Sequence, residues 1–268
     1  MATKKAVPSV KKSTAKKPSK TVSKTSTVKT VVGPKARTLF SSPLKGMPVA
    51  AALAAEFIGT FLLAAAIIAG QGQPIIIMFA IAGIVLLVGA LSGAHLNPAI
   101  TVAAFVTRKI TGLRAIGYVV AQFVGALAAL GLLNAFVGGA AEPAAGFAAA
   151  SLYEAAALPA GKEWYVFFAE ILGTSILGFA IATALRIKAD RLASAFTVGL
   201  GIFVALLFAA SAAAFASGSA IINPAVALSL NALKWELLPL GVYVLAPVIG
   251  AVIGFIVHDV LNVDKDKE

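Results

Sequence analysis

The chain has 268 residues, of which 60% are hydrophobic and only 12% are charged, and its mean hydropathy is +0.95. These values lie far outside the range of soluble globular domains and are typical of membrane proteins. The chain has no cysteine and only two histidines, His95 and His258. This composition excludes disulfides and thiol chemistry and argues against a histidine-rich metal site, so we expect neither a metal ion nor a cofactor.

The net charge of +11 comes from the amino-terminal segment 1–47, which contains twelve Lys and Arg residues and no Asp or Glu. The segment lacks hydrophobic periodicity and is too polar to bury a core, so we expect a disordered cytoplasmic tail. Two interpretations are open: a solvated tail that only fixes orientation, or a polybasic segment that contacts anionic lipids. We do not expect nucleic acid as a partner.

Six apolar segments follow the tail, most of them long enough to cross a bilayer core of about 30 Å at about 1.5 Å per residue. They fall near residues 48–69, 74–91, 115–136, 164–185, 192–214 and 237–258. Two further apolar pieces, 97–106 and 223–233, are about half the length that a span requires. The sequence therefore predicts an all-α polytopic membrane protein with six transmembrane helices and two half-length helices.

The segment 48–258 contains two similar halves, 48–136 and 164–258. Residues 55–60 (AEFIGT) recur as 169–174 (AEILGT), and residues 121–126 (AQFVGA) recur as 246–251 (APVIGA). Each half has three spans, and because three is odd, the second half is inverted relative to the first.

Basic residues in the loops orient the predicted spans. If the spans alternate, the following residues fall on the same side as the tail: Arg108, Lys109, Arg114, Arg186, Lys188 and Arg191. The other side has only Lys162 and Lys234. By the positive-inside rule both termini are cytoplasmic, including a short charged tail at 259–268. The stretch 138–162 is predicted to be a connecting loop on the outer side.

Both half-length pieces begin with the same tripeptide, as Asn97-Pro98-Ala99 and Asn223-Pro224-Ala225. Asparagine is a good N-cap and proline a good first helical residue. Because the halves are inverted, the two helices are expected to enter from opposite faces and to bring their amino termini together near the bilayer midplane. Helix amino termini carry partial positive charge and free amide donors. Such a meeting point repels cations and binds the oxygen of a neutral solute, as at a proton-blocking pore centre.

Two carboxylates, Glu56 and Glu170, lie inside predicted spans, where charged residues are costly and usually functional. One interpretation makes them proton or ion carriers. The interpretation that we favour makes them acceptors for backbone amides of the loops before Asn97 and Asn223, because both halves have the carboxylate at the same place. His95 either lines the mouth of a pore or is a hydrogen-bonded loop residue. We find no catalytic constellation and do not expect an enzyme.

Together these motifs resemble those of the major intrinsic protein family, the aquaporins and glycerol facilitators, over about residues 48–258. The resemblance rests on residues 92–99 (SGAHLNPA), Asn223–Ala225, the Ala-Glu pair near the start of each half, and Ala121-Gln122. It implies six spans with two re-entrant half-helices and a pore in each protomer. It further implies a homotetramer in the cell membrane that conducts water and small neutral solutes such as glycerol.

The chain departs from the family pattern after the second tripeptide, where most members have an arginine of the outer selectivity filter and this chain has Val226. Counting by the family spacing puts the other filter positions at Ile77, Ser211 and Ala220. The margin is one position for Ser211 and Ala220, because the second loop is one residue longer than the first. Valine supplies neither charge nor hydrogen-bond donors, so we expect a less polar filter.

Two other classes of function are open on the sequence alone. Inverted repeats with broken helices also occur in coupled secondary transporters. Coupling usually needs ionisable groups that change state along the path, and Glu56 and Glu170 are the candidates here. The third class is a membrane-tethered interaction protein that acts through its basic tail.

Overall fold

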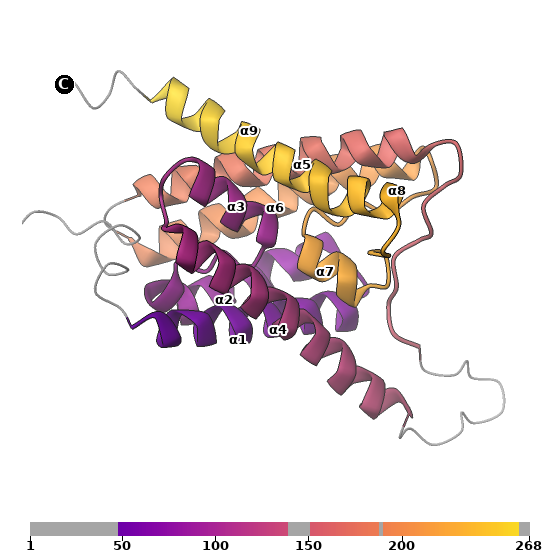
Figure 1. Ribbon diagram of the computed structural model, residues 1–268, viewed down its shortest axis with the longest axis horizontal. Helices are drawn as coiled ribbons and strands as arrows, with labels where there is room; N and C mark the ends of the chain where they lie inside the picture. The colour runs from indigo at the N-terminus through magenta and orange to yellow at the C-terminus, as the bar shows by residue number, and fades with distance from the viewer. Residues whose placement is uncertain (1–47, 139–150, 188–189, 263–268) are drawn as a thin grey trace, which may run out of the picture. The chain divides into compact units, whose positions relative to one another are not determined.

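The computed structural model describes residues 48–138, 151–187 and 190–262, and Figure 1 shows their arrangement. The helices in these ranges are α1 (Val49–Ala69), α2 (Pro74–Ser92), α3 (Pro98–Val106), α4 (Gly112–Gly138), α5 (Glu163–Arg186), α6 (Arg191–Ala214), α7 (Pro224–Ser229), α8 (Leu237–Leu240), the π-helical segment η1 (Gly241–Leu245) and α9 (Ala246–Leu261). The predicted tail 1–47 and the carboxy-terminal residues 263–268 lie outside the described ranges.

Within the described residues, six helices are long and apolar enough to cross a membrane: α1, α2, α4, α5, α6 and the continuous run Leu237–Leu261 that joins α8, η1 and α9. This result confirms the predicted fold, and the predicted ends differ from the observed ones by at most three residues. The last span widens into η1 directly before α9. Pro247 has no N–H to donate to the residue four positions earlier, which explains why regular α-helical bonding fails there.

The half-helices α3 and α7 lie between the longer helices, toward opposite ends of the bundle (Figure 1). Within the first half, α1 packs on α2 and α4; within the second, α5 packs on α6 and α9. The half-helices pack across the halves, α3 against α9 and α7 against α4, and α3 also contacts α4 of its own half. Each half-helix therefore depends in part on the other half of the chain.

The second half-helix is shorter than the apolar run that predicted it. We expected a helix from 223 to about 233, but α7 ends at Ser229. Asn231 adopts a left-handed backbone conformation with φ of 58°, and the amides of Ala232 and Leu233 both turn back to the carbonyl of Ala227. Asparagine tolerates this conformation, so it ends the helix although the apolar sequence continues.

Glycines allow the closest approaches between long helices. A β-carbon on Gly125 of α4 would overlap the carbonyl oxygen of Phe57 in α1. At the equivalent place in the second half, a β-carbon on Gly250 would overlap the carbonyl oxygen of Ile171 in α5. These two crossings bring the backbones into contact, as is common between transmembrane helices.

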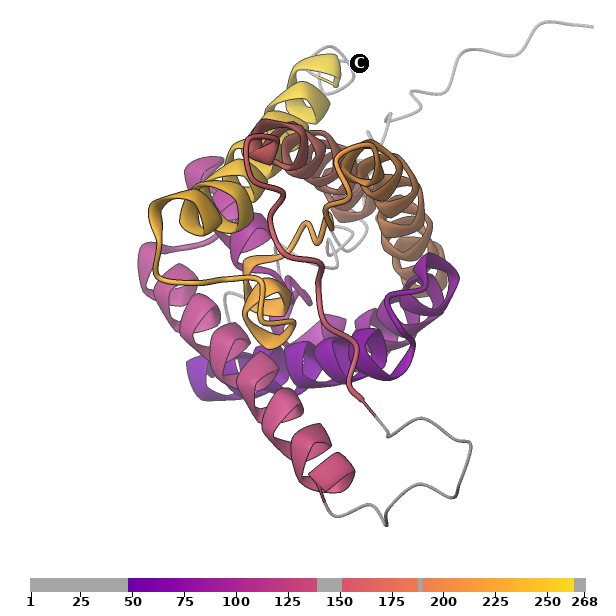
Figure 2. The same ribbon diagram turned by 90° about the vertical axis from the view of Figure 1, so that its right-hand side faces the viewer.

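Residues 151–162, which we call the strap, lead into α5 as an extended segment. Figure 2 shows the strap running across one end of the helix bundle. Its Ala155 amide donates to the carbonyl of Leu230, directly after α7. We call this end of the bundle the strap end. Lys109, at the opposite end, forms an ion pair of 2.9 Å with Asp259 of α9.

Candidate pore site

Asn97 and Asn223 begin the two half-helices. Their backbones are extended, with φ of −156° and −152°, and the prolines that follow them occupy the first helical positions. The Asn97 side-chain oxygen accepts the amide of Ala99 at 2.9 Å. The Asn223 oxygen accepts the amide of Ala225 at 3.1 Å and that of Val226 at 3.4 Å. Each asparagine therefore caps its own helix with its side-chain oxygen.

The two asparagines also join the half-helices to each other through their side-chain nitrogens. Asn97 Nδ2 donates to the main-chain oxygen of Ile222 at 2.8 Å, and Asn223 Nδ2 donates to that of Leu96 at 2.9 Å. The amino termini of α3 and α7 thus meet at one place. An asparagine amide has two hydrogens, and these contacts engage one on each residue. Both residues are buried but not completely, with exposed fractions of 4% for Asn97 and 6% for Asn223.

Glu56 and Glu170 hold the loops that precede the asparagines, and both side chains are fully buried. Glu56 accepts the amides of His95 and Leu96 at 2.9 and 2.8 Å. Glu170 accepts the amides of Ile221 and Ile222 at 2.6 and 2.8 Å. Each carboxylate therefore satisfies two loop amides, which would otherwise lack acceptors at this depth.

The first half extends this arrangement with side chains that have no counterpart in the second. Gln122 Nε2 donates to Glu56 at 2.7 Å and to Thr101 at 2.9 Å. Thr101 Oγ1 in turn lies 3.2 Å from His95 Nδ1, so His95 is a buried, hydrogen-bonded loop residue. In the second half Pro247 occupies the place of Gln122. Glu56 thus accepts three hydrogen bonds and Glu170 accepts two.

Sequence reasoning missed two buried tyrosines that hold the far ends of the same loops. Tyr118 in α4 donates its hydroxyl to the main-chain oxygen of Ser92 at 2.8 Å, and Tyr243 in η1 donates to that of Ser219 at 3.2 Å. A signal was present, because each tyrosine lies four residues before the aligned positions 122 and 247. Both tyrosines are found when the alignment of residues 121–126 with 246–251 is extended by one helical turn toward the amino terminus.

The four positions that family spacing assigned to the filter differ in burial. Ile77 and Val226 are 3% and 1% exposed, and Ala220 is half-buried. Ser211 is exposed and lies on the face of α6 that carries Val204, Leu207 and Phe208, which are also exposed. Ser211 therefore differs from the other three positions in its exposure, and its place in the filter stays a prediction.

The buried face of the same α6 turn carries Ala209 and Ala213. The count that leads to Ser211 has a margin of one residue, which is roughly 100° of turn on α6, so the filter position contributed by α6 stays a prediction.

Among the residues that the structure describes, no three His, Cys, Asp or Glu side chains lie close enough together to bind a metal ion. The arrangement offers instead two helix amino termini, amide donors and apolar walls, which suit an uncharged polar solute.

Six spans with two half-helices that meet at their amino termini define a polytopic membrane channel. Comparisons with known proteins agree. The Major intrinsic protein family matches residues 71–258. The chain is 32% identical over 213 residues to glycerol uptake facilitator protein-like 6 of Lactiplantibacillus plantarum, covering 74% of this chain and 92% of that protein. It is 32% identical over 183 residues to aquaporin NIP1-1 of Zea mays, covering 68% of this chain and 60% of that protein. The chain belongs to the major intrinsic protein family.

Among solved structures, the chain is similar to the aquaglyceroporin from Plasmodium falciparum, with a TM-score of 0.61. The similarity covers 82% of this chain and all of that one at 23% sequence identity. At this identity the likeness concerns the fold.

Proposed function

We propose that this protein is a passive membrane channel for water and small neutral solutes such as glycerol. The observation that carries the proposal is the reciprocal contact of Asn97 and Asn223 with the loops that precede each other's helix. It joins two positive helix ends at one point inside a six-span bundle. A family relative named as a glycerol uptake facilitator, 32% identical over most of its length, supports the same class.

The chemistry of this junction favours neutral solutes over ions. The second hydrogen on each asparagine amide is available to an oxygen of a passing water or alcohol. A cation meets the partial positive charge of two helix ends, and a proton passing along a water chain meets the same field. The positive helix ends alone therefore account for the exclusion of ions and protons, and no side chain has to change its ionisation.

The contacts of the two buried glutamates support a channel over a coupled transporter. A carrier carboxylate must be free to bind and release its ion. Glu56 and Glu170 instead accept loop amides with both oxygens. We infer that they are scaffold residues.

The proposed filter consists of Ile77, Ala220 and Val226, with Ser211 or a neighbour in α6 as its fourth position. The first three side chains are apolar, and Val226 directly follows the tripeptide at the start of α7. An apolar filter gives less hydrogen-bonding preference for water and better contact with a carbon skeleton. This composition supports conduction of glycerol beside water.

The distribution of charge supports an orientation. Basic residues at the end opposite the strap are Arg108, Lys109, Arg114, Arg186 and Arg191. By the positive-inside rule we assign this end and both termini to the cytoplasm and the strap end to the outside of the cell membrane. We further propose a homotetramer with a pore in each protomer, and contact of the segment 1–47 with anionic lipids.

Stopped-flow light scattering of proteoliposomes tests the proposal. We expect water and glycerol permeability above that of protein-free liposomes, with proton and potassium leak unchanged. Water permeability equal to that of protein-free liposomes would refute the channel, and glycerol uptake that requires a proton or sodium gradient would favour a coupled transporter. Asn223→Asp is a useful companion variant, because it keeps the cap oxygen but replaces the amide donor with negative charge. It should admit potassium ions.

A further inference from the structure

Ser219, the residue directly before the filter position Ala220, joins three parts of the chain. Its main-chain oxygen accepts the hydroxyl of Tyr243 at 3.2 Å. Its side-chain oxygen accepts the amide of Ala156 in the strap at 3.0 Å. One residue thus links the second pore loop to both the last span and the strap.

The equivalent serine of the first half is bonded differently. Tyr118 donates to the main-chain oxygen of Ser92 in the same way, but the Ser92 hydroxyl accepts the amide of Ala94 in its own turn. The first loop has one serine, directly before the glycine, as Ser92-Gly93. The second loop has Ser217-Gly218 in the same order and then a further serine, Ser219, and it is this additional hydroxyl that accepts the strap amide.

The strap contacts α7 on both sides. Beside the Ser219 contact before the helix, the Ala155 amide donates to the Leu230 oxygen at 3.1 Å after it, and Asn231 Nδ2 donates to Glu154 at 2.6 Å. With only six residues, α7 has few hydrogen bonds of its own. The strap therefore holds α7 from both of its ends by hydrogen bonds.

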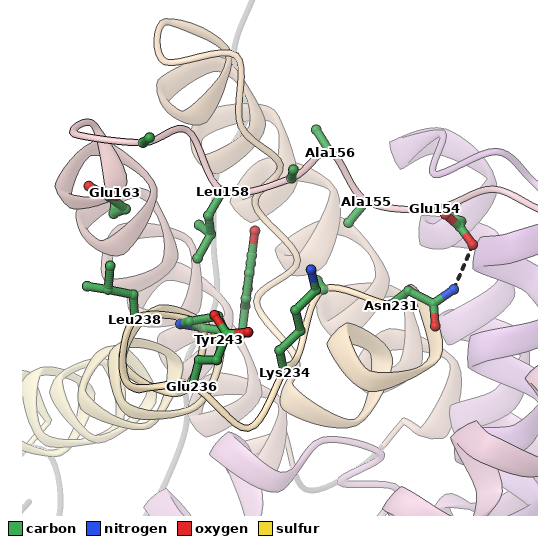
Figure 3. A pocket seen from close by; sticks show the side chains of 14 residues that line it. Glu154, Ala155, Ala156, Leu158, Glu163, Asn231, Lys234, Glu236, Leu238 and Tyr243 are labelled. Carbon is green, nitrogen blue, oxygen red and sulfur yellow. Dashed lines mark hydrogen bonds between the residues drawn. The ribbon is translucent and has the colours of Figure 1, made fainter.

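The strap also contacts the first half of the chain, and it borders a cavity. A β-carbon on Gly72, in the turn between α1 and α2, would collide with the ring of Tyr153. A cavity of about 480 Å³ lies between the strap and the start of the last span, and Leu158, Lys234 and Tyr243 are among its lining residues (Figure 3). Tyr243 thus has one side toward this cavity and its hydroxyl on the pore loop.

We propose that Tyr243 and Ser219 are positioning residues for the outer filter: together they fix the loop at Ala220, and so set how strongly the channel discriminates between water and glycerol. This inference rests on the proposed channel function. The side chains of Ile77, Ala220 and Val226 offer no hydrogen-bonding groups, so the spacing of these side chains becomes the main determinant of which solutes pass. That spacing depends on Ser219 because Ala220 has no side chain beyond its β-carbon with which to anchor itself.

Two substitutions test the two anchors separately. Tyr243→Phe removes the hydroxyl that holds the Ser219 carbonyl and keeps the ring. Ser219→Ala removes the acceptor for the strap and keeps the carbonyl for Tyr243. Tyr165→Phe is the matched control, because it removes the same hydroxyl from an exposed tyrosine near the start of α5. Each variant and the wild type are reconstituted, and water and glycerol permeabilities are measured on the same vesicles.

Loosening the loop should raise the ratio of glycerol to water permeability by about two- to tenfold in both test variants, as expected for losing one hydrogen bond. The control should keep the wild-type ratio. The ratio does not depend on how much protein folds, and Ser219→Ala remains informative if Tyr243→Phe yields too little protein. An unchanged or lower ratio in both test variants, or an equal rise in Tyr165→Phe, would overturn the inference. A wild type that conducts neither solute would instead refute the channel itself.

Discussion

Leu96 and Ile222 have the same left-handed backbone conformation, with φ of 54° in both residues, directly before the two asparagines. This conformation is costly for residues with a β-carbon, most of all for a β-branched one such as Ile222. In each case a glutamate binds the amide and the opposite asparagine binds the carbonyl. The strained residues therefore persist because side chains from other elements engage both of their polar groups.

The number of donors on each glutamate predicts unequal effects of the same substitution. In Glu→Gln one oxygen becomes an NH₂ group, which cannot accept a loop amide. Glu170→Gln then loses one of two contacts and Glu56→Gln one of three, so Glu170→Gln should be the more destabilising, by about 1–3 kcal/mol for a buried unpaired donor. Thermal unfolding of the purified protein in detergent measures this. Exposed Glu236→Gln is the control, and equal effects of the two buried substitutions would contradict the prediction.

Val226 can be replaced by the residue that most of the family has. Val226→Arg adds a fixed positive charge and five donors beside the second tripeptide. It should reduce glycerol permeability more than water permeability, because the larger solute has less room and water regains hydrogen-bonding partners. Swelling assays with both solutes give the ratio. Equal reduction of both permeabilities would count against Val226 as a filter residue.

Two positions that family spacing places in the same filter, Ser211 and Ala220, differ in their exposure. Ser211→Trp adds an indole to a face that already exposes Leu207 and Phe208, so permeability should stay within about twofold of the wild type, as for surface substitutions generally. Ala220→Trp puts the same bulk in the proposed filter and should abolish glycerol flux. Loss of flux in Ser211→Trp would show that this face of α6 borders the pore.

Two glycines of α4 should respond oppositely to the same added methyl group. Gly125→Ala places a β-carbon on the carbonyl of Phe57 and forces α1 and α4 apart, whereas Gly131 has open space around it. Gly125→Ala should therefore destabilise the protein by about 1–3 kcal/mol, as overpacking does. Gly131→Ala should stabilise it by about 0.5–1 kcal/mol through helix propensity. Circular dichroism during heating compares the two, and matching shifts would be inconsistent with the close crossing.

The sequence predicted the spans well because the bilayer imposes their length and polarity. It also predicted that each half-helix begins after an asparagine, since Asn-Pro is a local signal. It could not predict the end of α7. Asn231 ends the helix by adopting a left-handed backbone conformation, and the apolar residues around it give no sign of this. Nor could it predict that Asn97 binds Ile222, which lies 125 residues away and comes within reach only through the inversion of the two halves.

The filter shows a different limit of sequence reasoning. Val226 directly follows the tripeptide, whereas Ala220 and Ser211 are reached only by counting along a loop that is one residue longer than its counterpart. One residue turns a helix by roughly 100°, so the count alone does not determine which face of α6 contributes to the filter. Tyr118 and Tyr243 illustrate the opposite case. They occupy matching positions in the two halves, four residues before the aligned residues 122 and 247, so the internal repeat itself identifies them.

The packing of α3 against α9 and of α7 against α4 also has a consequence for biogenesis. During synthesis α3 is made well over a hundred residues before α9. Glu56 and Tyr118 of the first half can already hold the first pore loop at that stage, but one side of α3 has no partner helix until α9 is made. A chain truncated before residue 246 would leave that side of α3 without protein cover.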